Sequence, residues 1–402
     1  MLVLCLALLG GCKEEKGTSL YPPTSSGNPT PSVTGVTLNT PSALAGVTIL
    51  TITGTNFSTK NEENRVFFDA VQATTLTSSA TTLTVRVPNL VKDAVSLKVN
   101  TVGAASYSNS VFLNIAAAVS EFGGLTSSEE PVGIACDTAG NVYVSLQDGG
   151  SGRGIRQYID ATGAKDTFAL ANGVTFWTAL KMGPGGLIFG ARNQRALYTM
   201  AKGGAPVLYK AVSGANFYDL DFDNAGNIWT GGADTLLYRI TIADQSVKTY
   251  AVATSVDTIN VHSVRVYNGN LYVATKVNGT EAVYQYPILP SGDLGTRVKY
   301  FDLSAQSGYT FSKALAVTFN SDGDMYLGTD AAAGVLLVHP NGSFEPFYSG
   351  LFKPSTLLFA WGKKNSSTLY AVRTSSDGVT TKTMFKINTL KTGAPYYGRG
   401  DN

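Results

Sequence analysis

The chain has 402 residues, more than one compact core usually holds, so its length alone favours two domains. Charged residues make up only 14% of the chain and glycine contributes 43 residues, a composition typical of turn-rich all-β proteins. The net charge is +2, with only two histidines and three cysteines, which argues against a nucleic-acid-binding surface, a Cys/His zinc module and a disulfide scaffold.

The first residues, Met1–Leu9, form an apolar run that is too short to span a bilayer. The continuation Leu9-Gly10-Gly11-Cys12 resembles a bacterial lipobox. The resemblance implies that residues 1–11 are a lipoprotein signal peptide and that Cys12 becomes a lipid-carrying N-terminus, with palmitate among its acyl chains. Several acyl chains are needed for stable anchoring, so such a cysteine would hold the protein at a membrane. The alternative is a core strand that ends in an unrelated cysteine.

Cys12 is followed by Lys13-Glu14-Glu15-Lys16, with no aspartate in the second position. This pattern resembles the surface-export signal of Bacteroidetes lipoproteins, which implies an outer-membrane, lipid-anchored protein exposed at the cell surface. The alternative is a simple charged linker. Four prolines between Gly17 and Ser32 favour an extended chain. Residues 12–32 are therefore predicted to be a Pro/Ser/Gly-rich tether.

Residues 33–116 predict a small immunoglobulin-like β-sandwich. Apolar and polar residues alternate most clearly in Leu83–Val87 and Val95–Val99, as half-buried strands require. The segment resembles IPT/TIG domains in several short motifs: Pro41, Gly46, Ile52–Phe57, Val66–Asp69, Leu83–Pro88 and Ser108–Phe112. The resemblance implies a spacer or interaction module, with Gly54 at a backbone turn and Phe57 in the core.

From residue 119 onward one pattern recurs six times: an apolar strand, a turn rich in Asp, Asn and Gly, and a second strand with an aromatic residue. These aromatic residues are 40 to 54 positions apart: Tyr143, Phe189, Trp229, Tyr272, Tyr326 and Tyr370. Repeats of this length predict the blades of a β-propeller. Pro131–Tyr143 resembles an NHL repeat, which implies a six-bladed propeller over residues 119–402. Val119–Gly124 would then be an outer strand that pairs with the last blade and closes the ring, whereas the alternative is an open solenoid.

Alignment of the six innermost strands predicts an apolar set of residues between blades and a polar set that faces the central channel. Cys136 falls in the apolar set and is predicted to be a small buried residue. The polar set contains Lys181, Asp219, Asp221 and Arg265, and three of these occupy the same slot in consecutive blades. Because an isolated buried charge is costly, the set either satisfies itself or forms the polar floor of a ligand site.

Three residues with flat rings, Trp177, Tyr218 and His262, stand where inner strands begin. They are predicted to line the mouth of a funnel on which sugar rings stack, the alternative being ordinary rim packing. No catalytic motif accompanies them, so no catalytic residue is assigned. Asp223-Asn224 and Asp322-Gly323-Asp324 resemble fragments of calcium loops, but turns favour these residues in any case. No cofactor is expected, with Ca²⁺ as the weak alternative.

These observations support the hypothesis of a non-catalytic binding lipoprotein that captures a glycan or another polymer at the cell surface through its propeller. Its expected partners are the membrane, through the lipid, and the glycan or an envelope protein, but not nucleic acid. Two alternatives stay open: an interaction scaffold of an envelope complex, and a calcium-dependent lactonase or lyase.

Overall fold

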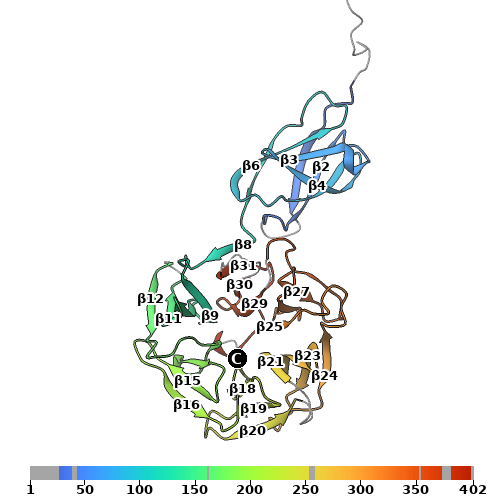
Figure 1. The fold of residues 1–402 in the computed structure, drawn as a ribbon. Coiled ribbons are helices and arrows are strands. Elements are labelled where there is room, and N and C mark those ends of the chain that lie inside the picture. Colours follow the sequence, from blue (N-terminus) through green and yellow to red (C-terminus); the bar gives the residue numbers. More distant parts are fainter. Residues whose placement is uncertain are drawn as a thin grey trace, which may run out of the picture. The chain divides into compact units, whose positions relative to one another are not determined.

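The computed structural model of the chain describes residues 27–38, 43–160, 163–252, 259–352, 355–373 and 382–399. The predicted signal peptide, Cys12 and most of the predicted tether lie outside these residues. The regular secondary structure of the described chain is almost entirely β-strand, in two compact units (Figure 1). Its helices are the short 3-10 turns η1 (Asn61–Glu63), η2 (Pro184–Gly186) and η3 (Tyr397–Arg399). Within the described ranges, no helix has the length and apolarity needed to cross a bilayer.

The N-terminal unit is an antiparallel sandwich with the strand order β1-β2-β5-β4-β3-β6-β7. Alternate residues on its strands are fully buried, including Leu50, Ile52, Val66 and Phe68, so one face of each strand supplies the core. Its strands are β1 (Ser32–Leu38), β2 (Ile49–Thr55), β3 (Asn64–Phe68), β4 (Val71–Ser78), β5 (Thr82–Arg86), β6 (Lys92–Thr101) and β7 (Val111–Ile115).

Two motifs of the sandwich have clear structural roles. Gly54 does not form the expected turn: a Cβ there would lie 2.0 Å from the carbonyl oxygen of Ser32, so glycine is needed where β1 and β2 approach closely. The left-handed backbone occurs instead at Asn56 (φ 60°), and Phe57 is buried as expected. Asn109, just before the last strand of the sandwich, is joined to β1. Its side-chain amide accepts a hydrogen bond from the Val33 N–H and donates one to the Val33 carbonyl, both at 2.9 Å.

The last residues of the predicted tether belong to the sandwich. The backbone N–H of Asn28 donates to the Gly103 carbonyl (2.9 Å), and its side-chain amide donates to the Val102 carbonyl (2.7 Å). Strand β1 begins at Ser32. The sequence placed these residues in the tether because their prolines and small polar residues carry no alternating pattern.

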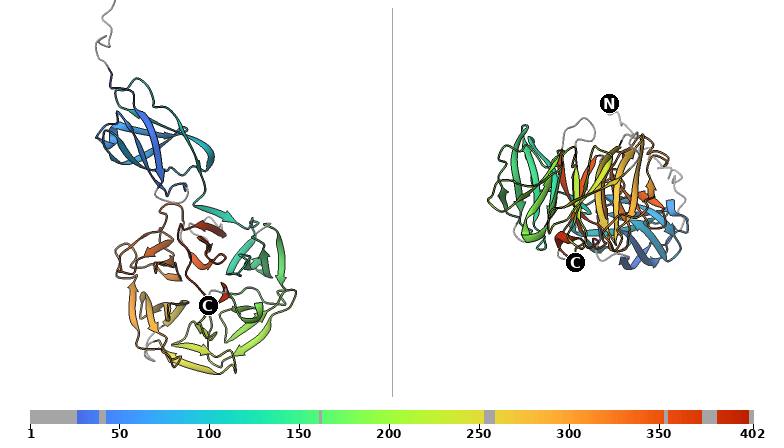
Figure 2. Two further views of the ribbon diagram at one scale, coloured as in Figure 1. Left: turned by 180° about the vertical axis from the view of Figure 1, so that it is seen from behind. Right: turned by 90° about the horizontal axis from the view of Figure 1, so that it is seen from below.

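The C-terminal unit is a ring of six four-stranded antiparallel sheets, as the repeats predicted (Figures 1 and 2). Blades 1 to 3 are β9 (Glu129–Cys136), β10 (Val142–Asp148), β11 (Ser151–Tyr158), β12 (Lys165–Ala169); β13 (Ala179–Met182), β14 (Ile188–Ala191), β15 (Ala196–Met200), β16 (Val207–Ala211); and β17 (Asp219–Phe222), β18 (Ile228–Gly231), β19 (Leu236–Ile240), β20 (Val247–Ala251). Blades 4 and 5 are β21 (Ile259–Tyr267), β22 (Asn270–Val277), β23 (Thr280–Pro287), β24 (Val298–Asp302); and β25 (Ala314–Phe319), β26 (Met325–Thr329), β27 (Val335–Val338), β28 (Phe344–Pro346).

Blade 6 closes the ring with strands from both ends of the propeller. Its strands are β29 (Thr356–Trp361), β30 (Thr368–Arg373), β31 (Thr383–Asn388) and β8 (Val119–Phe122). β8 pairs with β31 in the register Phe122 to Met384 and Val119 to Ile387. The prediction that an outer strand within Val119–Gly124 completes the last blade is confirmed, with the strand ending at Phe122, and the open solenoid is excluded.

In blades 1 and 3, the Asp/Asn/Gly turn of the repeat is held by the carboxylate of its first aspartate. In blade 3, Asp223 accepts hydrogen bonds from the backbone N–H groups of Ala225 and Asn227 (3.0 and 2.9 Å) and from the indole N–H of Trp229 (2.9 Å). In blade 1 the hydroxyl of Tyr143 donates to Asp137 in the same way (2.8 Å). The repeat therefore combines Asp with an aromatic donor because that donor satisfies the carboxylate of its own turn.

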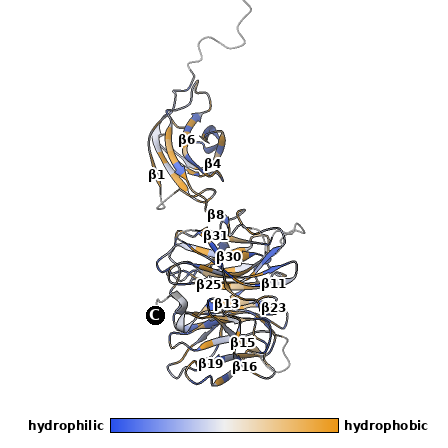
Figure 3. Ribbon diagram, turned by 90° about the vertical axis from the view of Figure 1, so that its left-hand side faces the viewer, coloured by the Kyte–Doolittle hydropathy of each residue, from blue (hydrophilic) through white to orange (hydrophobic). Residues whose placement is uncertain are grey.

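The cores of the propeller lie between neighbouring blades. One cluster combines Ile134 and Cys136 of blade 1 with Leu358 and Val372 of blade 6, and Cys136 is buried as predicted. Apolar residues run along the strands of both units (Figure 3). Because each blade buries its faces against the next, the apolar set of the inner strands stabilises the ring as a whole.

Beyond β31, the chain crosses one face of the ring instead of ending at its edge. We call residues Thr389–Arg399 the C-terminal segment; it is the red chain that runs toward the centre in Figures 1 and 2. The Ser321 N–H donates to the Thr392 carbonyl (2.8 Å), and the Ala394 N–H donates to the Phe319 carbonyl (3.0 Å). Tyr397 then stacks on Phe222 of blade 3, at 5.2 Å between ring centroids. The segment thus covers the face of the ring that carries the turns between the first and second strands of the blades, such as the β25–β26 turn.

Candidate functional site

The polar residues of the inner strands join neighbouring blades. Asp219 of blade 3 accepts hydrogen bonds from the Ser263 hydroxyl and the Val264 N–H of blade 4, both at 2.9 Å. Asp221 accepts the Val266 N–H at 2.9 Å. These backbone groups belong to the free edge of β21, so the carboxylates supply the partners that the channel edge of the strand would otherwise lack.

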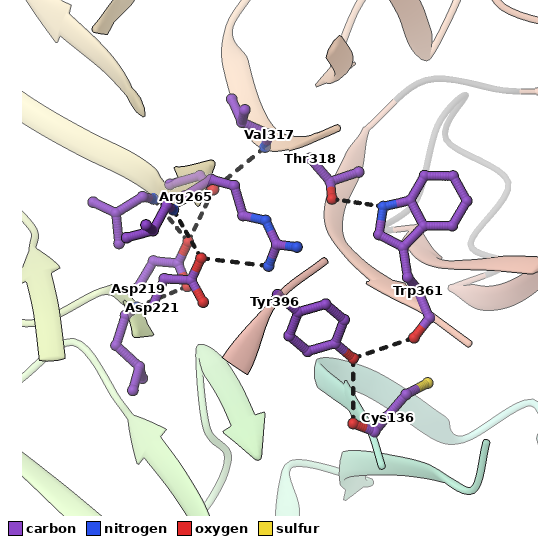
Figure 4. A network of polar contacts seen from close by, with 12 residues as sticks. Cys136, Asp219, Asp221, Arg265, Val317, Thr318, Trp361 and Tyr396 are labelled. Carbon is purple, nitrogen blue, oxygen red and sulfur yellow. Dashed lines mark hydrogen bonds and ion pairs between the residues drawn. The ribbon is translucent and has the colours of Figure 1, made fainter. Parts of the chain in front are cut away.

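Of the three charged residues predicted to share one slot, Asp221 and Arg265 pair with one another, and the charge of Lys181 reaches Asp219. Arg265 is only 4% exposed, and its Nη1 lies 3.4 Å from the Asp221 carboxylate (Figure 4). Burial raises the pKa of Asp219, while the charge of Lys181 and the hydrogen bonds from Val264 and Ser263 lower it. The self-satisfied ion cluster therefore accounts for most of these polar groups.

The C-terminal segment reaches into the same channel. The ring of Tyr396 lies 4.8 Å from the guanidinium carbon of Arg265, and its hydroxyl lies 3.3 Å from the carbonyl oxygens of Cys136 and Trp361 (Figure 4). One side chain thereby connects blades 1, 4 and 6 across the centre of the ring. Sequence analysis missed it, although an adjacent pair of tyrosines after the last repeat was a visible signal.

The aromatic residue predicted at the mouth of the funnel, Trp177, lies in the core. Its side chain is 1% exposed and packs edge-on against Tyr198, with centroids 5.4 Å apart. A Cβ on Gly190 would lie 2.8 Å from the Trp177 ring, so glycine at this position makes room for the indole. The prediction that Trp177 offers a stacking surface is therefore wrong, because the space left by Gly190 allows the ring to pack between the strands.

Tyr218 and His262 are also largely enclosed. Burial is the main cause that raises the pKa of Tyr218, with the nearby charge of Asp219 adding to it. His262 Nε2 lies 3.4 Å from the carboxylate of Glu281, whose side chain is itself buried. Sequence analysis did not identify Glu281, because nothing near it in the chain distinguishes it from other strand residues.

An open groove lies beside the C-terminal segment. It has a volume of about 520 Å³ and is lined by Phe222, Asn224, Val266, Tyr267, Asn268, Ser321, Pro395, Tyr396 and Tyr397. Its lining comes from blades 3, 4 and 5 and from the C-terminal segment, and it contains no acidic or basic side chain. None of the residues that the sequence singled out for ligand binding lines this groove, although Asn224, named above as part of a fragment that resembles a calcium loop, does.

Two rigid ring pairs form walls of the groove. Tyr267 stacks on buried Phe319 with centroids 4.4 Å apart and planes 6° apart, and Tyr397 stacks on Phe222 at 5.2 Å and 28°. Both tyrosines are half-buried, so each is supported from beneath by a phenylalanine. Asn224, Asn268 and Ser321 add amide and hydroxyl groups that both donate and accept hydrogen bonds.

The acidic turns that resembled calcium loops are engaged in the fold. Asp223 holds its own turn, and Asp324 accepts hydrogen bonds from Asn320 and His339, at 2.9 and 2.8 Å. In the part of the chain that the structure describes, no group of three or more His, Cys, Asp or Glu residues is arranged to hold a metal ion.

Residues 31–114 match the IPT/TIG domain family. A search of curated protein sequences found no significant match to the chain. Among solved structures, a Bacteroides thetaiotaomicron protein described as a phosphatase is 10% identical over 91% of this chain and 98% of its own, with a TM-score of 0.56.

An auxiliary nutrient binding protein from the same organism is 11% identical over 89% of this chain and 98% of its own, with a TM-score of 0.52. An auxiliary nutrient binding protein from Bacteroides ovatus is 11% identical over 89% and 97%, with a TM-score of 0.49. At these identities, the first two likenesses concern the fold alone. The chain thus carries an IPT/TIG domain of immunoglobulin-like fold at residues 31–114, followed by a six-bladed β-propeller.

Proposed function

We propose that the chain is a non-catalytic binding protein that captures a glycan through the groove beside the C-terminal segment. The observation that carries this proposal is the pair of supported tyrosines, Tyr267 and Tyr397, on the walls of one 520 Å³ groove. Sugar rings present flat C–H faces that stack on aromatic rings, and their hydroxyls need partners that can both donate and accept. The amides of Asn224 and Asn268 meet the second need.

The uncharged lining of the groove favours neutral sugar units. An acidic sugar would bring a carboxylate to a surface that offers no cationic side chain to offset its loss of hydration. The nearest ion pair at this face, Lys391 with Asp322, already satisfies itself at 2.5 Å. We therefore expect neutral polysaccharide segments to bind better than uronic-acid polymers.

The N-terminal sequence supports a location for this activity. We propose lipidation of Cys12 and anchoring at the outer membrane with the protein exposed at the cell surface, on the strength of the lipobox-like Leu9–Cys12 and the charged residues after it. The propeller fold that the chain shares with an auxiliary nutrient binding protein agrees with capture of a nutrient polymer.

The test is a combined glycan and peptide array with the purified chain, followed by titration of the best ligand. Tyr397→Ala should weaken glycan binding about tenfold, because it removes one stacking surface. Asn268→Gly should weaken it less, since glycine keeps the left-handed backbone (φ 44°) and removes only the amide.

Tyr107→Ala is the matched control, because this tyrosine of the sandwich is 52% exposed and is not among the residues that line the groove. Unchanged glycan binding by both groove variants would refute the groove. Binding to peptides and not to glycans would support the envelope scaffold instead.

A further inference from the structure

A small cavity in the central channel is distinct from the groove, although Tyr396 lines both. Its volume is about 10 Å³, roughly the space that one water-sized particle needs. The two charged side chains among its lining residues, Lys181 and Arg265, are both cationic, and the carboxylates of Asp219 and Asp221 are not part of that lining. The cavity wall therefore favours negative charge.

One edge of the Arg265 guanidinium has no partner in the described protein. Nη1 pairs with Asp221 and the ring of Tyr396 covers the face, but the buried Nε and Nη2 make no hydrogen bond. Nε and Nη2 share one edge of the planar group, so their N–H bonds are parallel and bind an anion with two donors. Leaving buried, charged donors unsatisfied is costly, so this edge calls for an acceptor.

Other groups around the cavity complete the same arrangement. Thr318 lines it, and because its Oγ1 accepts the indole N–H of Trp361 at 3.0 Å, its own hydroxyl hydrogen is free to donate elsewhere. Lys181 adds a second positive charge from blade 2. Figure 4 shows the Arg265 guanidinium pointing into the space between Thr318 and Tyr396.

We propose that this cavity is a binding site for a small monovalent anion of the size of chloride, held by the Nε–Nη2 edge of Arg265 with Lys181 and Thr318 around it. The volume excludes sulfate and phosphate. The anion accepts the two N–H bonds that Nε and Nη2 of Arg265 leave unsatisfied and stabilises the centre of the ring, where blades 2, 4 and 5 and the C-terminal segment meet.

Crystals of the chain soaked in sodium bromide test the proposal directly. We expect an anomalous peak in the cavity within hydrogen-bond distance of Nε and Nη2 of Arg265, weakened in crystals of Lys181→Met. A water molecule there without anomalous signal would overturn the proposal.

A solution measurement supplies an independent readout. The Tm should be about 2 °C higher in sodium chloride than in sodium gluconate of equal ionic strength, because chloride fits the cavity and gluconate is too large for it. Lys181→Met should reduce this difference, whereas Lys313→Met, at an exposed position outside the cavity, should leave it unchanged. Equal Tm values in the two salts, or equal effects of the two variants, would contradict a specific site. Neither outcome depends on glycan binding, so the two proposals can fail separately.

Discussion

Where the inner strands of the propeller begin, aromatic side chains are packed into the wall of the ring; where those strands end, aromatic side chains line an open groove. Trp177 represents the first end, 1% exposed and fitted against Gly190. Tyr397 represents the second, half-buried and stacked on Phe222. The same chemical type of residue therefore stabilises the fold at one end and offers a binding surface at the other.

The difference arises from what faces each ring. The glycine opposite Trp177, Gly190, leaves room for the indole to pack between strands. Tyr267 and Tyr397 each stack on a phenylalanine, which occupies the equivalent space and keeps the tyrosine at the surface. The position of an aromatic residue within a blade is thus less informative than the size of its neighbour on the adjacent strand.

The largest expected effect is at the beginning of the inner strands. Trp177→Ala should lower the free energy of unfolding by about 3–5 kcal/mol, because it leaves a cavity in a packed core. Chemical denaturation measures this loss. Leu208→Ala, at a side chain that is 56% exposed, should cost less than about 0.5 kcal/mol. If the Trp177→Ala protein had normal stability but impaired glycan binding, Trp177 would be a binding residue and not a core residue.

A smaller loss is expected at the turns where the inner strands end. Asp223→Ala should cost about 2–3 kcal/mol, because it leaves the Trp229 indole N–H and two backbone N–H groups without acceptors. The control is Asp244→Ala in an exposed hairpin, where the carboxylate accepts one N–H from Ser246 and solvent can replace it. Equal losses in the two variants would mean that burial of the Asp223 carboxylate contributes nothing.

The groove itself should tolerate change. Tyr397→Ala should lower the free energy of unfolding by only about 1 kcal/mol, the value of one aromatic pair, while it weakens glycan binding. Thermal denaturation beside the binding titration separates the two effects. A loss as large as that of Trp177→Ala would show that Tyr397 is a core residue.

The smallest effect concerns acid stability at Glu129, which lies in β9 of blade 1. Burial raises the pKa of this carboxyl, but hydrogen bonds from Thr126 and Arg156 outweigh it, and the net pKa is lowered. A lowered pKa means stability that is present above the pKa of the unfolded chain and lost as the pH falls through the folded value. Glu129→Gln should therefore make the Tm fall less steeply as the pH is lowered into the acid range. The corresponding loss of unfolding free energy in the wild-type chain is about 1 kcal/mol or less.

The ring could be predicted from the sequence because each blade repeats the same local information. An apolar inner strand, a polar or glycine-rich turn and a second strand with an aromatic residue recur in all six blades, and in blades 1 and 3 an Asp holds the turn and accepts from that aromatic residue. The unpaired run Val119–Gly124 showed how the ring closes. The groove could not be predicted, since three of its nine lining residues, Pro395, Tyr396 and Tyr397, come from a segment that belongs to no repeat. The side on which Trp177 packs depends on Gly190, a contact that no periodicity encodes.

The pairing of β8 with β31 also constrains how the chain acquires its structure. The Ser120 hydroxyl donates to the Lys386 carbonyl across 266 positions of sequence, so the sixth blade stays incomplete until nearly the whole polypeptide has been synthesised. Closing so long a loop is entropically costly, and until β31 arrives, β8 has no strand to pair with and presents an unpaired edge to other chains. During biogenesis, the protein is therefore most vulnerable to aggregation in the interval between synthesis of its fifth blade and arrival of its final strand.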